Sequence, residues 1–175
     1  MKTKLPLYLA LLLLTQCSKC KTDDPAPVAP NPVDMLPPAT QTGQRTFGCL
    51  LNGQPWNLAG NPFGGPLLAT SYSSNRLAVV ANRSSTNGFE RISFVIRNLY
   101  ASGAYPVTDS TRNFALYENF TTGCSTYTSS TPVGTVALTR LDLVNRIVSG
   151  TFSFTLEKPG CGRVVVTDGR FDSRF

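Results

Sequence analysis

Carboxylates are the main side chains in this sequence that could do acid–base chemistry, because the chain has no histidine. Without histidine, the commonest general base, the Ser–His–Asp and Cys–His triads and most zinc sites are missing. A glycoside hydrolase instead needs two carboxylates about 5–10 Å apart. The acidic residues after position 45 are Glu90, Asp109, Glu118, Asp142, Glu157, Asp168 and Asp172.

Most of these acids lie at expected turns or beside arginine, where solvation explains them. Asp168 and Asp172 flank an expected hairpin turn and could approach each other as a catalytic pair. Together with Asp142 they could bind calcium through oxygen ligands, although no dense Asp-x-Asp loop supports such a site. We therefore expect a protein without catalytic residues, metal or cofactor. A hydrolase of glycans or lipids that uses Asp or Glu is kept as an alternative.

Aromatic and arginine side chains offer a second chemistry, the binding of a ligand. Sugars stack on exposed aromatic faces, and arginine donates hydrogen bonds to their hydroxyls. The candidate ligand contacts are Trp56, Tyr105, Tyr117 and Arg170, although Trp56 follows an expected hairpin and suits a packing role better. The net charge of +6 would favour acidic glycans or anionic lipids as partners. The arginines are scattered rather than clustered, so no nucleic acid partner is expected.

The first residues have the features of an export signal. Lys2 and Lys4 precede an apolar run over 5–14, which is well short of the about 20 residues that a transmembrane helix needs. The run ends Leu14-Thr15-Gln16-Cys17, which resembles a bacterial lipobox. The resemblance implies that 1–16 is a signal peptide and that acylated Cys17 anchors the chain in a lipid bilayer. A plain signal peptide with a structural Cys17 is the alternative.

The residue after the anchor bears on which membrane holds it. Ser18 stands where an aspartate would retain such a lipoprotein at the inner membrane. We therefore expect an outer membrane lipoprotein, on the cell surface or on the periplasmic face.

A proline-rich stretch separates the anchor from the rest of the chain. Prolines are dense between residues 25 and 42 and aromatic residues are absent, which favours an extended, flexible chain. We expect a tether over 17–45, in which Met35 and Leu36 have no further role. The segment 46–175 is long enough for one domain with a real core.

This segment is predicted to be all-β, because apolar and polar residues alternate and no helical periodicity is present. In 89–97, for example, Ile92, Phe94 and Ile96 share one face, and in 147–156 Thr151 and Ser153 point to solvent. Other strands are expected at 46–51, 67–72, 76–81, 104–107, 115–120, 134–141, 163–167 and 170–175, the last two joined by an Asp168-Gly169 hairpin turn. Asn52-Gly53 predicts another hairpin, whose Pro55 limits the return strand to a sheet edge.

Strands of this number must pack as two sheets or close into a barrel. We expect a single antiparallel β-sandwich or small closed barrel of about 8–10 strands, mostly with up-and-down neighbours. A lipocalin-like barrel that carries an apolar ligand is the alternative.

The cysteines allow one disulfide in this domain. Cys124 and Cys161 both lie in glycine-rich, loop-like contexts, and an extracytoplasmic location makes their pairing plausible. Cys49 lies in the first expected strand and would be a buried free thiol. The rival pairings are Cys49–Cys161 and Cys49–Cys124.

The C-terminal third carries a recognisable run, with Ser149-Gly150-Thr151-Phe152-Ser153-Phe154 followed by Thr167-Asp168-Gly169-Arg170-Phe171-Asp172. With Asn52-Gly53 and Trp56 upstream, 46–175 resembles a family of uncharacterised Bacteroidota lipoproteins with a domain of unknown function. The resemblance implies a fold and a location but no activity. We therefore expect a non-enzymatic binding or structural module of the cell envelope, with a glycan or a protein as its ligand.

Overall fold

The chain forms a β-sandwich, which decides between the two predicted architectures. The computed structural model describes residues 30–61, 65–86, 88–108, 111–127 and 134–175. Eleven strands are found in these residues, slightly more than expected, together with one short 3₁₀ turn (η1, Pro32–Met35). The strands are β1 Thr46–Leu51, β2 Gln54–Asn57, β3 Leu68–Ser73, β4 Arg76–Ser85, β5 Gly88–Ile96, β6 Gly103–Val107, β7 Phe114–Asn119, β8 Cys124–Tyr127, β9 Gly134–Asp142, β10 Ile147–Lys158 and β11 Gly162–Arg174.

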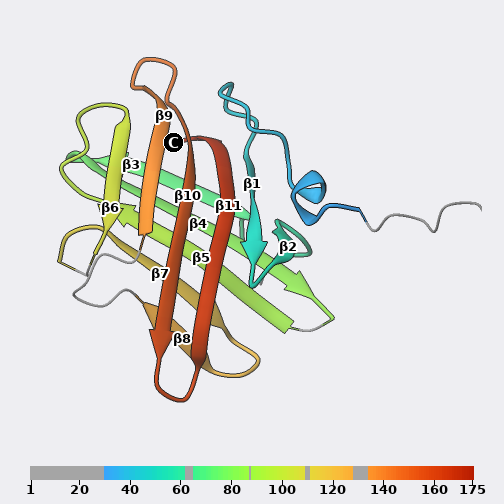
Figure 1. Cartoon of the computed structure of the whole chain (residues 1–175). Coiled ribbons are helices and arrows are strands. Elements are labelled where there is room, and N and C mark those ends of the chain that lie inside the picture. Colours follow the sequence, from blue (N-terminus) through green and yellow to red (C-terminus); the bar gives the residue numbers. More distant parts are fainter. Residues whose placement is uncertain (1–29, 62–64, 87, 109–110, 128–133) are drawn as a thin grey trace, which may run out of the picture.

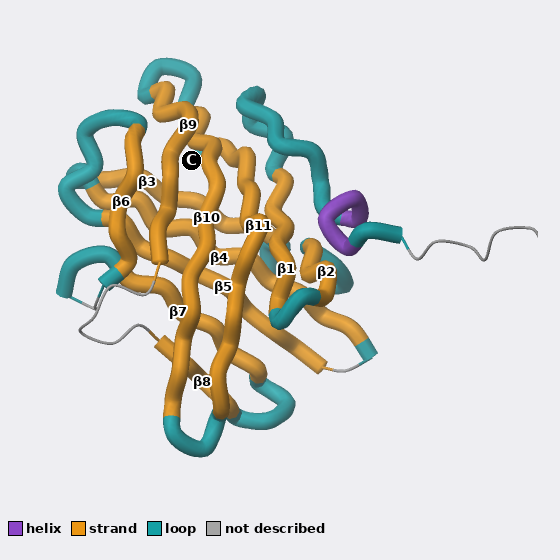
Figure 2. The backbone as a smooth tube through the Cα atoms, in the orientation of Figure 1, coloured by secondary structure: helices purple, strands orange, loops and turns teal. Residues whose placement is uncertain are grey.

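The strands form two antiparallel sheets that lie face to face (Figures 1 and 2). One sheet has six strands in the order β2-β1-β11-β10-β9-β6, and the other has five in the order β3-β4-β5-β7-β8. The first strand, β1, pairs with the last, β11. Sequence order favoured up-and-down neighbours, and this long-range pairing was not predicted. None of the described helices is both long and apolar enough to cross a membrane.

The core between the sheets follows from the alternation in the sequence. Ile92, Phe94 and Ile96 on β5 are fully buried, as predicted. Phe152 of β10 contacts several aromatic rings in this core, and its ring lies 4.8 Å from Phe47 and 5.4 Å from Phe94, measured between ring centroids. Aromatic rings at these distances are close-packed and add to the stabilisation that burial of their area provides.

The predicted hairpin at Asp168-Gly169 is wrong, because β11 runs through both residues without turning. Asp168 has a φ of 53°, and the pairing of β11 with β10 shifts register between Phe152 and Phe154. This pattern is a β-bulge, in which one extra residue of β11 is accommodated without reversing the strand. A side chain at Gly169 would meet the Phe152 ring, so only glycine fits there. The bulge uses the same residue types as a hairpin turn, which explains the error.

Both edges of the six-stranded sheet carry a proline. Pro55 lies in β2 and Pro106 in β6, the two outermost strands of that sheet. Proline has no N–H to donate to a ladder and is tolerated mainly at edges. The prediction that Pro55 places its strand at an edge is therefore confirmed.

The predicted disulfide is present. Cys124 and Cys161 are bonded, with their Cα atoms 5.5 Å apart. The bond ties β8 of the five-stranded sheet to the turn between β10 and β11 of the six-stranded sheet. Cys49 is a buried free thiol, as expected, and burial raises its pKa to about 12.

Candidate functional site

Small side chains, most of them with hydroxyl groups, lie beside Arg170 on the outer face of the six-stranded sheet. Thr151 of β10 lies between Ala137 of β9 and Arg170 of β11 in the strand register, and Ser153 pairs with Thr135. Side chains two residues apart on a strand point to the same face. These five residues therefore form two adjacent rows on the side of the sheet that faces away from the core.

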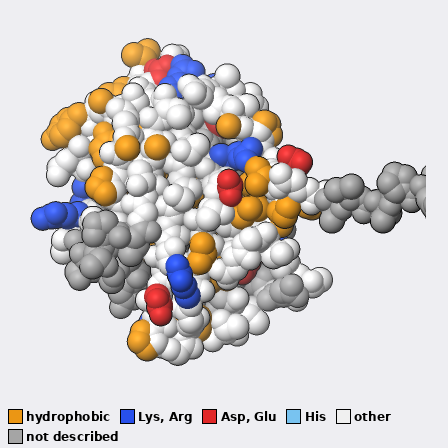
Figure 3. Space-filling view, in the orientation of Figure 1, with side chains coloured by type: hydrophobic (Ala, Val, Ile, Leu, Met, Phe, Trp, Pro, Cys, Tyr) orange, Lys and Arg blue, Asp and Glu red, His pale blue; other side chains and the backbone are white. Residues whose placement is uncertain are grey.

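A hollow of about 480 Å³ lies over these rows and opens to solvent. Its lining residues are Ala39, Thr135, Ala137, Thr151, Phe152, Ser153, Asp168, Gly169 and Arg170. Figure 3 shows this side of the molecule, where much of the centre is backbone or side chains that are neither charged nor hydrophobic. The volume falls within the range of about 300–1,000 Å³ that is usual for small-molecule sites.

Arg170 is the cation of this hollow. Its side chain is half-buried, and among the described residues it makes no hydrogen bond, ion pair or ring contact. Two other half-buried arginines on the outer faces of the sheets have an acid beside them, since Arg91 pairs with Glu118 and Arg140 with Asp142. Arg170 therefore presents its donors to the hollow without a partner of its own.

One wall of the hollow comes from the N-terminal segment, in which residues 36–44 form what we call the strap. The strap was expected to be part of a flexible tether, and this is wrong for the described residues. Leu36 is buried, and the side chain of Asn57 donates a hydrogen bond to the carbonyl of Met35. Gly48 leaves room for Pro37, because a side chain at this position would collide with the proline ring. Ala39 then reaches the hollow.

Asp172 holds the C-terminal end of the strap. We call this carboxylate and the groups that donate hydrogen bonds to it the clasp. Its carboxylate accepts hydrogen bonds from the backbone N–H groups of Thr42, Gly43 and Gln44, at 3.0, 2.8 and 3.0 Å. It also accepts from the hydroxyls of Thr40 and Ser149, each at 2.7 Å. Arg170, two residues away on β11, forms no ion pair with Asp172, whose carboxylate is occupied by the donors of the strap and Ser149.

The clasp also sets the charge state of Asp172, whose residue has no exposed surface. Burial alone would raise the pKa of this carboxyl group, because it disfavours the charged form. The hydrogen bonds from Ser149, Thr40 and the strap backbone act in the opposite direction and lower the pKa to about 2. Asp172 is therefore a carboxylate at neutral pH.

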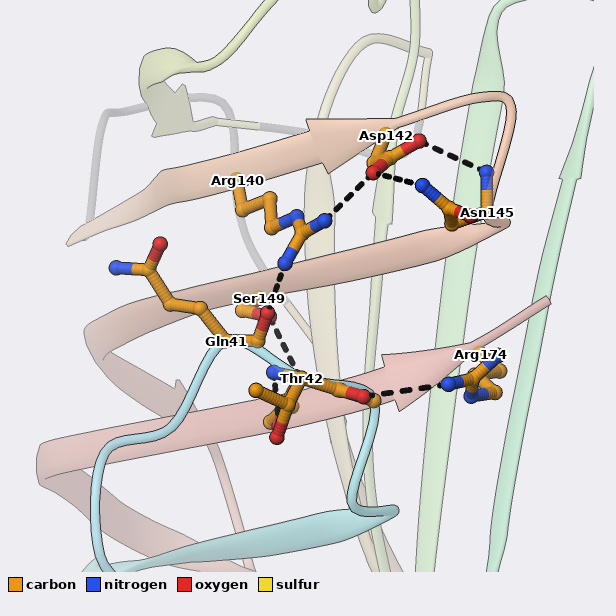
Figure 4. Close-up of polar contacts among 9 residues, drawn as sticks. Gln41, Thr42, Arg140, Asp142, Asn145, Ser149 and Arg174 are labelled. Atoms are coloured by element: carbon orange, nitrogen blue, oxygen red, sulfur yellow. Dashed lines mark hydrogen bonds and ion pairs between the residues drawn. The ribbon is translucent and has the colours of Figure 1, made fainter.

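A second attachment holds the strap to β9, as Figure 4 shows. Arg140 donates to the carbonyl of Gln41 and pairs with Asp142 at 2.6 Å. Asp142 in turn accepts from the side chain and backbone of Asn145, which closes the turn between β9 and β10. The hydrogen bonds from Asn145, and after them Arg140, hold the pKa of Asp142 well below its usual range. Asp142 and Asn145 therefore cap this loop, a role that suits the short polar side chains of both residue types.

Two of the predicted ligand contacts, Trp56 and Tyr117, are instead core residues. Trp56 is 1% exposed, and its indole N–H donates to Glu90 at 3.0 Å. The hydroxyl of Tyr117 donates to the other oxygen of Glu90 at 2.6 Å, and burial followed by this bond raises the pKa of Tyr117. Their prediction as ligand contacts is wrong, because both rings are buried and their polar atoms are paired inside the protein.

The other two predicted contacts lie on different strands of the six-stranded sheet. Tyr105 of β6 packs against the edge of the core, and its hydroxyl donates to the carbonyl of Ala101 at 2.6 Å. Arg170 alone of the four lines the hollow. The hydroxyl residues beside it were predicted to face solvent but were not recognised as a site. Their alternation on the solvent side of two neighbouring strands was the available signal.

Asp168 and Asp172, the two acids that could have formed a catalytic pair, lie in different surroundings. Asp168 lines the hollow, whereas Asp172 is enclosed by the strap. Among the described residues, no three acidic or cysteine side chains lie close enough to hold a metal ion. The space between the two sheets is filled by core side chains, and the hollows found on the described part of the chain open at its surface.

The fold and the hollow define a β-sandwich domain with an open, polar depression on one outer face. Residues 66–173 match a family described as "Domain of unknown function (DUF6252)", and the chain belongs to this family. The match spans β3 to β11 and includes both Arg170 and Asp172. No curated protein and no solved structure matches the chain.

Proposed function

We propose that this protein is a lipid-anchored binding module of the bacterial outer membrane that holds a glycan in the hollow around Arg170. The anchor would be Cys17, which lies outside the described residues, as do 1–16. Its support is the basic start, the short apolar run and the lipobox-like end of that run. The resemblance of the C-terminal run to uncharacterised Bacteroidota lipoproteins supports the same location.

The observation that carries the binding proposal is the guanidinium of Arg170, which has no partner in the described part of the chain and lies among hydroxyl groups. Thr135, Thr151 and Ser153 can each donate and accept hydrogen bonds, and Arg170 has five donors in a fixed fork. Such a set suits a ligand that is rich in hydroxyls. The floor is already formed by regular strands, so its side chains need little reordering when a ligand binds.

The binding proposal is tested by a glycan array probed with the full chain carrying Cys17→Ser. Arg170→Ala should lose the glycans that the wild-type sequence binds. Arg163→Ala is the matched control, because Arg163 lies on the same strand, is exposed and does not line the hollow. An array on which no glycan binds would count against a glycan ligand, and hits that both variants retain would place the binding site elsewhere.

The anchor is tested separately in the native host. Metabolic labelling with a radioactive fatty acid should mark the wild-type protein in the outer membrane fraction, and Cys17→Ala should abolish both the label and the membrane association. Labelling that survives the substitution would contradict the role of Cys17.

A further inference from the structure

The residues that line the hollow also indicate which class of glycan it would bind. This inference rests on the proposed function. We infer that the glycan is acidic and that a sugar carboxylate pairs with Arg170 while the hydroxyls of the same sugar contact Asp168, Thr151 and Ser153.

Arg170 is half-buried and forms no ion pair within the described part of the chain. Arg91 and Arg140 are half-buried as well, and each has a carboxylate within 3.4 Å. Removing water from a charged group without pairing it is costly, so a ligand that covers Arg170 must supply an acceptor. A carboxylate matches the planar fork of arginine with two parallel hydrogen bonds.

Asp168 restricts which anions fit. It lines the same hollow and lies two residues from Arg170 on β11, and the bulge at this point gives it its positive φ. A ligand with several negative charges, such as a phosphorylated chain, would be repelled by this carboxylate. A sugar acid has one negative charge and several hydroxyls, and these hydroxyls can donate to Asp168.

The shape of the hollow fits a sugar ring better than a long apolar chain. Its floor is made of Ala137, Thr151 and Ser153, which leave the space above the strands open. Ala39 of the strap adds an apolar wall, against which the C–H face of a sugar can pack. Because the clasp fixes the strap, this wall is in place before a ligand arrives.

The test compares sugar acids with their neutral counterparts on the full chain carrying Cys17→Ser. The probes are the methyl glycosides of glucuronate and galacturonate and of glucose and galactose, titrated by NMR of the backbone amides. We expect at least one acid to bind about tenfold or more tightly than its neutral partner, as charge-assisted hydrogen bonds predict. The amide signals of Thr151, Ser153 and Arg170 should shift.

Arg170→Gln should remove the preference for the acid, and Arg163→Gln should leave it unchanged. The dispersion of the amide spectrum shows in the same experiment that each variant is folded. Equal binding of acid and neutral sugars at these residues overturns the inference but leaves the glycan-binding proposal standing. Binding of neither kind also overturns the inference, and the proposed function fails with it only if the array is blank as well.

Discussion

Replacement of Asp172 by asparagine is the sharpest test of how the strap is held. The substitution keeps the size of the side chain but removes its charge and turns one acceptor oxygen into an NH₂ group. Whichever oxygen is lost, at least two donors among Thr40, Thr42, Gly43, Gln44 and Ser149 lose their acceptor. The strap should then detach at its far end.

The magnitude follows from the pKa of Asp172. Hydrogen bonding lowers this pKa from 3.8 to about 2, and each pKa unit corresponds to about 1.4 kcal/mol of preference for the charged form. The charge of Asp172 therefore contributes roughly 2 kcal/mol to the free energy of unfolding at neutral pH. Unsatisfied N–H groups add to the loss, so Asp172→Asn should lower the free energy of unfolding by about 2–4 kcal/mol.

The stability lost in Asp172→Asn should depend on pH, because the contribution of Asp172 requires its charged form. The folded-state pKa of Asp172 lies below its value in the unfolded chain, so its contribution is fully present above about pH 4. It is lost as the pH falls from about 4 towards 2. The difference in stability between wild type and Asp172→Asn should therefore shrink in acid. The stability lost through an uncharged substitution in the core should not show this dependence on pH.

Urea denaturation at several pH values measures the stability difference, and hydrogen exchange of residues 42–44 reports on the strap directly. Asp168→Asn is the matched control, because this acid lies on the same strand but is exposed and holds no part of the strap. Slow exchange of the 42–44 amides in Asp172→Asn, with unchanged stability, would refute the reasoning.

Three further predictions concern the core and the cysteines. Replacing Cys124 and Cys161 together by serine should lower the free energy of unfolding by roughly 3–4 kcal/mol in urea titrations, because the bond closes a loop between residues 37 apart. The loss should be no larger than the loss that a reductant causes in the wild-type protein. An unchanged free energy of unfolding would contradict this prediction. Cys49 should not react with iodoacetamide in the native protein, since its thiol is buried and its pKa is raised to about 12; rapid alkylation at pH 8 without unfolding would count against this burial. Gly150→Ala should lower the thermal midpoint, with a loss of roughly 1–3 kcal/mol, because the new methyl group would meet the carbonyl oxygen of Ala137; a midpoint equal to that of wild type would be the contrary result.

Much of the fold could be predicted from local patterns in the sequence. The alternation in β5 and β10 places Phe94 and Phe152 in the core, and Asn52-Gly53 forms the expected turn between β1 and β2. The disulfide between Cys124 and Cys161 was predicted because both residues lie in loop-like contexts. These features depend on neighbours in the chain or on a few residue types, so one sequence is enough to recognise them.

The missed features depend on contacts between distant parts of the chain. Asp168-Gly169 has turn chemistry, but its pairing on both sides with β1 and β10 makes it a bulge. The strap has the composition of a flexible linker, and it is ordered only because Asp172, about 130 residues away, accepts its N–H groups. The candidate site was found in part, since Arg170 was named but the hydroxyl residues across the strands from it were not.

The prolines at the two edges of the six-stranded sheet affect how copies of this protein behave when they are crowded together. An exposed edge strand can pair with the edge of a neighbouring molecule and so begin aggregation. Pro55 and Pro106 each remove a donor from one of these edges and interrupt the row of N–H groups that such pairing requires. Copies of this protein that are concentrated side by side should therefore remain separate molecules along this sheet rather than joining into a continuous one.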